Sequence, residues 1–320
     1  MNPWWIVLIV VLVLFFVGIP TLIFLMSGYM TTKMLKKSDI KIRNMKNMDV
    51  SFYDRGPLKD MAAKGLEFMD TLDVKETTIN SFDGFKLHAY LIKNPYQETN
   101  KYFLGMHGFK SGPRHEYAPY LKYYLDAGYN IVIPDERAQY KSEGDYITMG
   151  LKEKYDCLDW AKWIVKTYGK DIKILIQGIS MGAATVCLAS ELDLPKQVVG
   201  IVSDCPYSSL KDELEFQMKR INKKVPVKII LGGINYFIKR KMHVSINDTQ
   251  PIDAVKNAKV PMIFYHGAKD EMCDVEFSKK LYEACSSKKK LIITDEANHA
   301  ESIAYQKENY IKNIEELFNI

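Results

Sequence analysis

One serine stands between two glycines in the stretch QGISMGAAT, residues 177–185, directly after an apolar run. Gly178, Ser180 and Gly182 form the pattern GxSxG. In a sharp turn from a strand to a helix, such glycines let the neighbouring backbones pass, and the strain lifts the serine hydroxyl clear of the sheet. The same pattern also arises by chance around a serine that only caps a helix. Because a strand-like run precedes it and alanines follow, the sequence favours Ser180 as a nucleophile.

A serine hydroxyl attacks a carbonyl only when a base takes its proton, and the base works best when a carboxylate orients it. Two later apolar runs, 261–265 and 291–294, are followed by Asp270 and His299 respectively. The competing acids and histidines are Glu271, Asp274, His88, His107, His115, His243 and His266. Among the histidines, His299 alone lies in the last loop, where a base can face Ser180. We therefore predict a triad in the chain order Ser180, Asp270, His299.

The tetrahedral intermediate of acyl transfer also needs two backbone donors for its oxyanion. The amide of Met181, directly after the nucleophile, is one candidate. The second is the amide of Phe109, which follows the apolar run 102–106 and which Gly108 allows to come close to the site. The alternative is that this segment is only a glycine-rich turn. We expect Met181 and Phe109 to form the oxyanion hole.

These residues must be positioned by an alternating series of strands and helices. An antiparallel pair with a tight turn at Asp83-Gly84 opens the domain. The predicted strands are 74–80, 86–93, 102–106, 129–134, 172–176, 198–202, 261–265 and 291–294. The predicted helices are 116–127, 151–168, 181–191, 275–285 and 300–318. This pattern predicts an α/β fold, with a mostly parallel sheet covered by helices on both faces.

Two further helical patterns, 210–221 and 225–242, lie in the segment 208–250, which is too long for one crossover helix. We interpret it as a cap inserted between strands. In open parallel sheets the ligand lies beyond the carboxyl ends of the strands, which is where each candidate residue falls. No internal repeat is visible, so we expect one hydrolytic domain over residues 74–320.

The chain resembles the α/β-hydrolase superfamily, in particular bacterial serine hydrolases of the cinnamoyl-esterase type and related membrane-anchored proteins. The resemblance covers roughly residues 74–320. The motifs that carry it are His107-Gly108-Phe109, Gly178 to Gly182, His266-Gly267-Ala268-Lys269-Asp270 and Asn298-His299. Relatives usually have DxRGxGxS where this chain has Asp135 to Ser142, with Ala138 and Tyr140 in place of glycines. The resemblance implies a structural role for Asp135 and Arg137, and no metal or organic cofactor.

An uncharged apolar run, Trp4 to Met26, is long enough to cross a bilayer, which takes roughly 20 residues. A cleaved signal peptide is the alternative, but no basic segment precedes the run and no small-residue cleavage site follows it. We expect a membrane anchor over residues 1–28 and a basic juxtamembrane linker over 29–73. Since Lys and Arg flank the run only on its carboxyl side, the body should face the cytoplasm.

The net charge of +5 is concentrated next to this run, because residues 33–46 hold six basic residues and one acidic residue. The remaining chain is balanced, which argues against a nucleic-acid partner. Five scattered cysteines lack metal or redox spacing, so we interpret them as buried thiols. They are Cys157, Cys187, Cys205, Cys273 and Cys285.

The apolar cap segment 225–238 predicts a partly hydrophobic small-molecule substrate. Basic residues bracket it, so the cap either rests on lipid headgroups or packs on the body with a solvated basic rim. A carboxylic-ester hydrolase that forms an acyl-enzyme at Ser180 is the favoured function. The alternatives are a peptidase, amidase or acyltransferase with the same triad, and a non-catalytic binding protein. The last class usually loses a triad member, and none is missing here.

Overall fold

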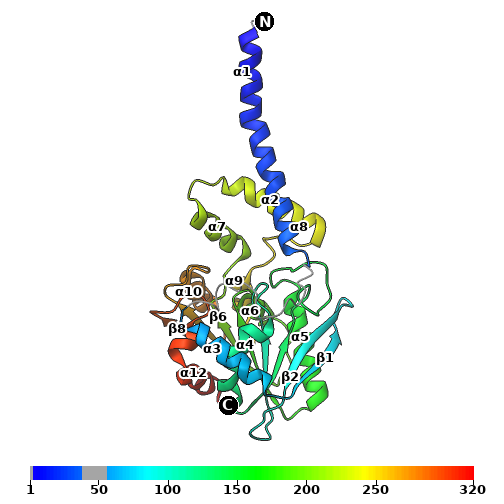
Figure 1. Ribbon diagram of the computed structural model, residues 1–320, viewed down its shortest axis with the longest axis vertical. Helices are drawn as coiled ribbons and strands as arrows, with labels where there is room; N and C mark the ends of the chain where they lie inside the picture. Colours follow the sequence, from blue (N-terminus) through cyan, green and yellow to red (C-terminus); the bar gives the residue numbers. More distant parts are fainter. Residues whose placement is uncertain (1–2, 38–55) are drawn as a thin grey trace.

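The computed structural model describes residues 3–37 and 56–320, and its centre is an eight-stranded sheet (Figure 1). The strand order is β1-β2-β4-β3-β5-β6-β7-β8. Strand β2 pairs antiparallel with both β1 and β4, and the remaining neighbours are parallel. The bounds are β1 Val74–Asn80, β2 Lys86–Ile92, β3 Lys101–Met106, β4 Tyr129–Pro134, β5 Lys173–Ile179, β6 Val198–Asp204, β7 Met262–Gly267 and β8 Lys289–Thr294. This is the predicted mostly parallel sheet.

Side chains alternate between two apolar layers on the faces of the sheet. In β5, Leu175 and Ile179 join one cluster, and Ile174 and Ile176 join the other. Helices α3 Leu58–Asp70, α4 Pro113–Asp126, α11 Ser302–Gln306 and α12 Glu308–Phe318 contribute to the first cluster. Helices α5 Glu153–Tyr168, α6 Met181–Ala189 and α10 Val275–Ala284 contribute to the second, with the short α9 Pro251–Ala254 and a 3-10 turn Val255–Asn257 beside them. The burial of both faces explains why the parallel strands are apolar throughout.

The inserted segment forms two helices, α7 Leu210–Ile221 and α8 Val227–Met242, as the sequence predicts. They lie on the side of the sheet from which the N-terminal helix emerges (Figure 1). A third apolar cluster forms beneath them, in which Leu231 and Ile234 of α8 pack with Met181 of α6. The cap and the start of the helix that follows Ser180 therefore share one apolar cluster.

The N-terminal apolar run is a continuous helical segment of 33 residues, Pro3–Leu35. It comprises α1 Pro3–Val13, a π-helical turn Leu14–Gly18 and α2 Ile19–Leu35. In the described part of the chain it is the one helix long and apolar enough to cross a membrane. The helix continues beyond residue 28, and Leu35 is buried beneath the cap.

Part of the segment 29–73 belongs to the folded body. Helix α3 packs on α4, and its Leu58 and Met69 are fully buried. A Cβ atom on Gly65 would lie 2.0 Å from the Ala118 carbonyl oxygen, so glycine sets the close approach of these two helices. Residues 38–55, which include the basic Lys41, Arg43 and Lys46, lie outside the described residues.

Candidate active site

The turn between β5 and α6 holds Ser180 in a conformation that few residues adopt. Its φ of 56° and ψ of −119° lie in a strained region for a residue with a side chain. A Cβ atom on Gly178 would lie 2.0 Å from the Gly182 carbonyl oxygen, and one on Gly182 would lie 2.0 Å from that of Met106. Both glycines of the GxSxG pattern are thus required by backbone contacts. The Ser180 amide donates to the Asp204 carbonyl oxygen at 2.9 Å, which holds the turn against the end of β6.

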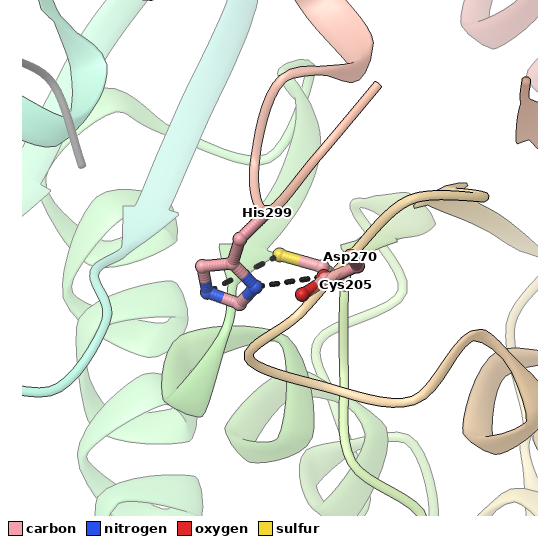
Figure 2. Close-up of side chains that lie close together, drawn as sticks. All are labelled: Cys205, Asp270 and His299. Atoms are coloured by element: carbon pink, nitrogen blue, oxygen red, sulfur yellow. Dashed lines mark hydrogen bonds and ion pairs between the residues drawn. The ribbon is translucent and has the colours of Figure 1, made fainter. Parts of the chain in front are cut away.

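The loops after β7 and β8 bring Asp270 and His299 into direct contact (Figure 2). The distance from His299 Nδ1 to Asp270 Oδ2 is 2.8 Å. The other carboxylate oxygen, Oδ1, accepts hydrogen bonds from the amides of Met272 and Cys273 at 2.7 and 2.9 Å. His266, a competing base in the sequence, lies on the same carboxylate, with Nε2 at 3.2 Å from Oδ2. The carboxylate is therefore fixed from several sides and presented to the imidazole.

Burial and mutual pairing shift the pKa of Asp270 in opposite directions, and the same is true of His299. Burial alone would raise the pKa of Asp270. The positive charges of His299 and His266, together with their hydrogen bonds to the carboxylate, hold that pKa well below its usual value. Burial alone would lower the pKa of His299, but the Asp270 carboxylate raises it above the usual 6.5. An ionised carboxylate beside a histidine of raised basicity is the electrostatic arrangement that a general base requires.

A thiol occupies the other side of the imidazole. Cys205 Sγ lies 3.8 Å from His299 Nε2 (Figure 2), and Cys205 directly follows the Asp204 that holds Ser180. Burial raises the pKa of the Cys205 thiol to about 12, so it stays protonated at neutral pH. Cys205, Asp270 and His299 together offer three atoms that a metal ion could bind. A protonated thiol is a poor metal ligand, so this environment does not favour such a site.

The loop after β3 places Gly108 against the nucleophile. A Cβ atom on Gly108 would lie 3.3 Å from Ser180 Cβ, and the Gly108 amide donates to the buried Glu116 carboxylate at 3.2 Å. The next amide, that of Phe109, donates to no acceptor among the described residues. As the first residue of α6, Met181 likewise has an amide without an intrahelical partner. Phe109 and Met181 both remain candidates for the oxyanion hole.

The loop from Asp135 to Ser142 supports the loop that holds Phe109. The Lys110 amide donates to Gln139 Oε1 at 2.7 Å, and the Tyr140 hydroxyl donates to the Lys110 carbonyl oxygen at 3.1 Å. Ala138 and Tyr140 have φ values of 57° and 47°, which is the left-handed conformation that favours glycine. The backbone is therefore left-handed at both positions, although neither holds the glycine of the family pattern. Arg137 is buried and bonded to the carboxylate of Asp156 at 2.6 Å, as befits a structural residue.

Several supporting residues carry no signal in the sequence. Cys205 and Glu116 belong to no motif, and Gln139 stands at a variable position of the segment 135–142, so only their positions in space relate them to the site. The remaining competing histidines make other contacts: His88 pairs with Asp135, His107 Nε2 accepts from the Glu136 amide, and His243 ends α8. The structure thus brings Asp270 and His299 together and places Ser180 at the same edge of the sheet.

Comparisons with known proteins agree with this architecture. The family model for X-Pro dipeptidyl-peptidase (S15 family) matches residues 76–224. An esterase of Pyrococcus furiosus is similar in structure, with a TM-score of 0.62, 25% identity, and coverage of 78% of this chain and 93% of the esterase. The chain is an α/β-hydrolase.

Two further proteins are similar to this α/β-hydrolase. The acylaminoacyl peptidase of Pyrococcus horikoshii has a TM-score of 0.57 and 19% identity, and the match covers 80% of this chain but 43% of the peptidase. An uncharacterized protein of Bacillus subtilis, YqkD, is 23% identical over 269 residues, which cover 83% of this chain and 87% of YqkD. The relatives with a named activity include both esterases and peptidases, so the hydrolase class is supported while the bond that is cleaved differs among them.

Proposed function

We propose that this α/β-hydrolase cleaves carboxylic esters through an acyl-enzyme at Ser180. His299 Nε2 removes the hydroxyl proton as Ser180 Oγ attacks the substrate carbonyl, and Asp270 stabilises the imidazolium that forms. The amides of Phe109 and Met181 stabilise the oxyanion, each worth about 3 kcal/mol of barrier. The imidazolium then protonates the departing alcohol. Water, activated by the same base, releases the acid and restores the serine.

The observation that carries this proposal is the 2.8 Å contact between His299 Nδ1 and Asp270 Oδ2 next to a strained serine turn. A carboxylate on Nδ1 favours the tautomer in which Nδ1 carries the proton and Nε2 acts as the proton acceptor. Strain at a residue with a side chain persists only where the surrounding structure enforces it. Together these features support a nucleophilic role for Ser180.

Labelling with a fluorophosphonate probe tests the nucleophile. The purified full chain should be labelled covalently, and Ser180→Ala should abolish both labelling and hydrolysis of p-nitrophenyl acetate. Ser287→Ala, which changes a half-buried residue in the bend before β8, is the matched control and should retain both. Labelling that persists in Ser180→Ala would refute the proposal.

Cleavage of amides is the second candidate, because the matching family model and one structural neighbour are peptidases. A matched pair of p-nitrophenyl esters and p-nitroanilides with the same acyl group distinguishes the two. We expect kcat/KM to be much higher for the ester. A preference for the anilide would assign the chain to the peptidase class.

We further propose that the N-terminal helix anchors the protein as a single membrane span, with the hydrolase body in the cytoplasm. The helix has the length and apolar character for this role, and the basic residues follow it. The apolar cluster beneath the cap, where Leu231 and Ile234 adjoin Met181, supports a partly hydrophobic acyl group as the substrate.

A further inference from the structure

The N-terminal helix is attached to the cap through small residues. Ser27 Oγ of α2 lies 2.9 Å from the Phe24 carbonyl oxygen and 3.2 Å from that of Ile230 in α8. A Cβ atom on Gly233 would lie 2.2 Å from the Phe24 carbonyl oxygen, and one on Gly28 would lie 2.8 Å from that of Gly233. Glycines and serines that bring two helix backbones this close are typical of helix pairs within membranes.

The lower end of α2 is also tied to the hydrolase body. The Lys37 amide donates to the Asp145 carbonyl oxygen at 2.7 Å, and the Ile147 amide donates to that of Leu35 at 2.8 Å. Two independent attachments therefore fix the direction in which the anchor leaves the body. The cap lies between the body and the protruding part of the helix (Figure 1).

Aromatic residues indicate the depth of the membrane along this helix. Trp4 and Trp5 near one end and Tyr29 near the other are exposed, and such residues favour the two headgroup regions. Trp5 and Tyr29 are separated by about 36 Å of helix, which matches a hydrocarbon core of about 30 Å with its boundaries. Because α8 contacts Phe24, Ser27 and Gly28, this cap helix lies at the same depth as the boundary.

The cap has the charge that an anionic bilayer attracts. Between Glu215 and Asp248 the sequence has eight basic residues and no acidic residue. Lys219 pairs with Glu215, and the other seven are exposed and form no ion pair with any described residue. They are Arg220, Lys223, Lys224, Lys228, Lys239, Arg240 and Lys241. Ile221, the last residue of α7, is 80% exposed, which is unusual for an isoleucine in a folded domain.

We infer that the end of α7, the α7–α8 loop and the start of α8, residues 220–228, form a membrane-docking surface that binds anionic phospholipid headgroups and inserts Ile221. This inference rests on the proposed membrane anchor. Each basic residue near the surface contributes attraction to anionic lipid, and Ile221 adds apolar contact. Since α8 and Met181 belong to one apolar cluster, docking places the cap side of the site near the bilayer. Esters of amphiphilic lipids are the substrate class that this placement serves.

Fluorescence of full-length protein in vesicles tests the docking surface. The five native cysteines are buried, so Ile221→Cys can be labelled with an environment-sensitive nitrobenzoxadiazole dye. In vesicles of phosphatidylcholine mixed with phosphatidylglycerol, we expect a blue shift and loss of quenching by iodide. Lys170→Cys, in the turn before β5, is the control and should stay quenched. The triple variant Arg220→Gln, Lys223→Gln, Lys224→Gln should lose the effect, whereas Lys162→Gln, Lys166→Gln, Lys170→Gln should keep it.

A matched pair of variants tests the attachment of α2 to α8. Gly233→Ala forces a contact with backbone and should reduce the protection of the Ile221→Cys label. Gly232→Ala should not, because its Cβ atom would lie 3.6 Å from the Phe24 ring, an ordinary contact. If the protein floats with the vesicles of phosphatidylcholine and phosphatidylglycerol but the label at position 221 stays quenched in them, the docking surface is refuted and the anchor stands. If the protein does not float with them, the anchor and the docking surface both fail.

Discussion

Ser180 and Cys205 are two potential nucleophiles that directly follow the neighbouring strands β5 and β6, and Cys205 contacts the imidazole of His299. Cys205 is fully buried and its pKa is raised to about 12, so almost no thiolate forms at neutral pH. Ser180 is partly exposed on a strained turn. The difference in environment, more than the difference in chemical type, favours the serine. The thiol contacts Nε2, where it helps to position the ring.

Replacing the Cys205 thiol distinguishes a residue that positions the imidazole from a nucleophile. Cys205→Ala should retain fluorophosphonate labelling and lower kcat/KM by less than about tenfold, because it removes one contact of the base and none of the reacting atoms. Iodoacetamide should not inactivate the native enzyme at neutral pH. Loss of labelling in Cys205→Ala, with normal thermal unfolding, would instead make Cys205 the nucleophile.

The pH dependence follows from the pairing of His299. Only the neutral imidazole accepts a proton, so kcat/KM should rise tenfold per pH unit below the pKa of His299 and level off above it. Because Asp270 raises that pKa, the acid limb should lie above the ordinary 6.5. Asp270→Asn should move the limb to lower pH and reduce kcat by about 10⁴. A pH-rate profile on a soluble ester measures both, and a native limb below pH 6 would contradict the assignment.

At the scale of elements, the sequence predicts strands and their order well because the apolar runs are short and bounded by turns. The eight strands fall within a few residues of the expected ranges, and the candidate residues follow their carboxyl ends. Helix α3 was not expected, although Leu58, Ala62 and Met69 have helical spacing, because Gly65 and the basic residues before it are equally typical of a linker. The expected helix 300–318 is broken at Lys307, whose φ of 46° ends α11.

The residues that support the site could not be predicted from the sequence, because their contacts join separate elements. Glu116 reaches the Gly108 amide from α4, and Gln139 reaches the Lys110 amide from the loop after β4. Each contact depends on how two elements approach in space. A single sequence predicts the elements but does not determine that approach.

The close approach of β3 to the start of α6 gives a prediction about stability. Gly182→Ala places a Cβ atom 2.0 Å from the Met106 carbonyl oxygen, so the turn must move, at a cost of about 1–3 kcal/mol. Gly169→Ala is the control, since its Cβ atom meets nothing within 4 Å and only its φ of 98° is unfavourable. Thermal unfolding of the detergent-solubilised chain compares them. Gly182→Ala should also lose fluorophosphonate labelling, and equal stability and labelling in the two variants would contradict this view of the turn.

At the scale of the whole molecule, the N-terminal helix packs on the cap and shares an apolar cluster with the residue that follows Ser180. Helix α2 packs on α8 at Gly233, and Leu35 of α2 belongs with Leu231 of α8 and Met181 of α6 to one apolar cluster. The N-terminal helix is therefore packed into the folded body, both through the cap and through Leu35 at its end.

The orientation of this unit in a cell is the remaining prediction. The body should lie in the cytoplasm, because the basic residues that flank the span on its carboxyl side are retained there. In spheroplasts of a bacterial host that express the full chain with a C-terminal epitope, added protease should leave the body intact, and lysis should expose it to cleavage. A membrane protein with an outward-facing domain is the control for protease activity. If the body is cleaved in intact spheroplasts, the orientation is the reverse, and the cap would face the outer leaflet.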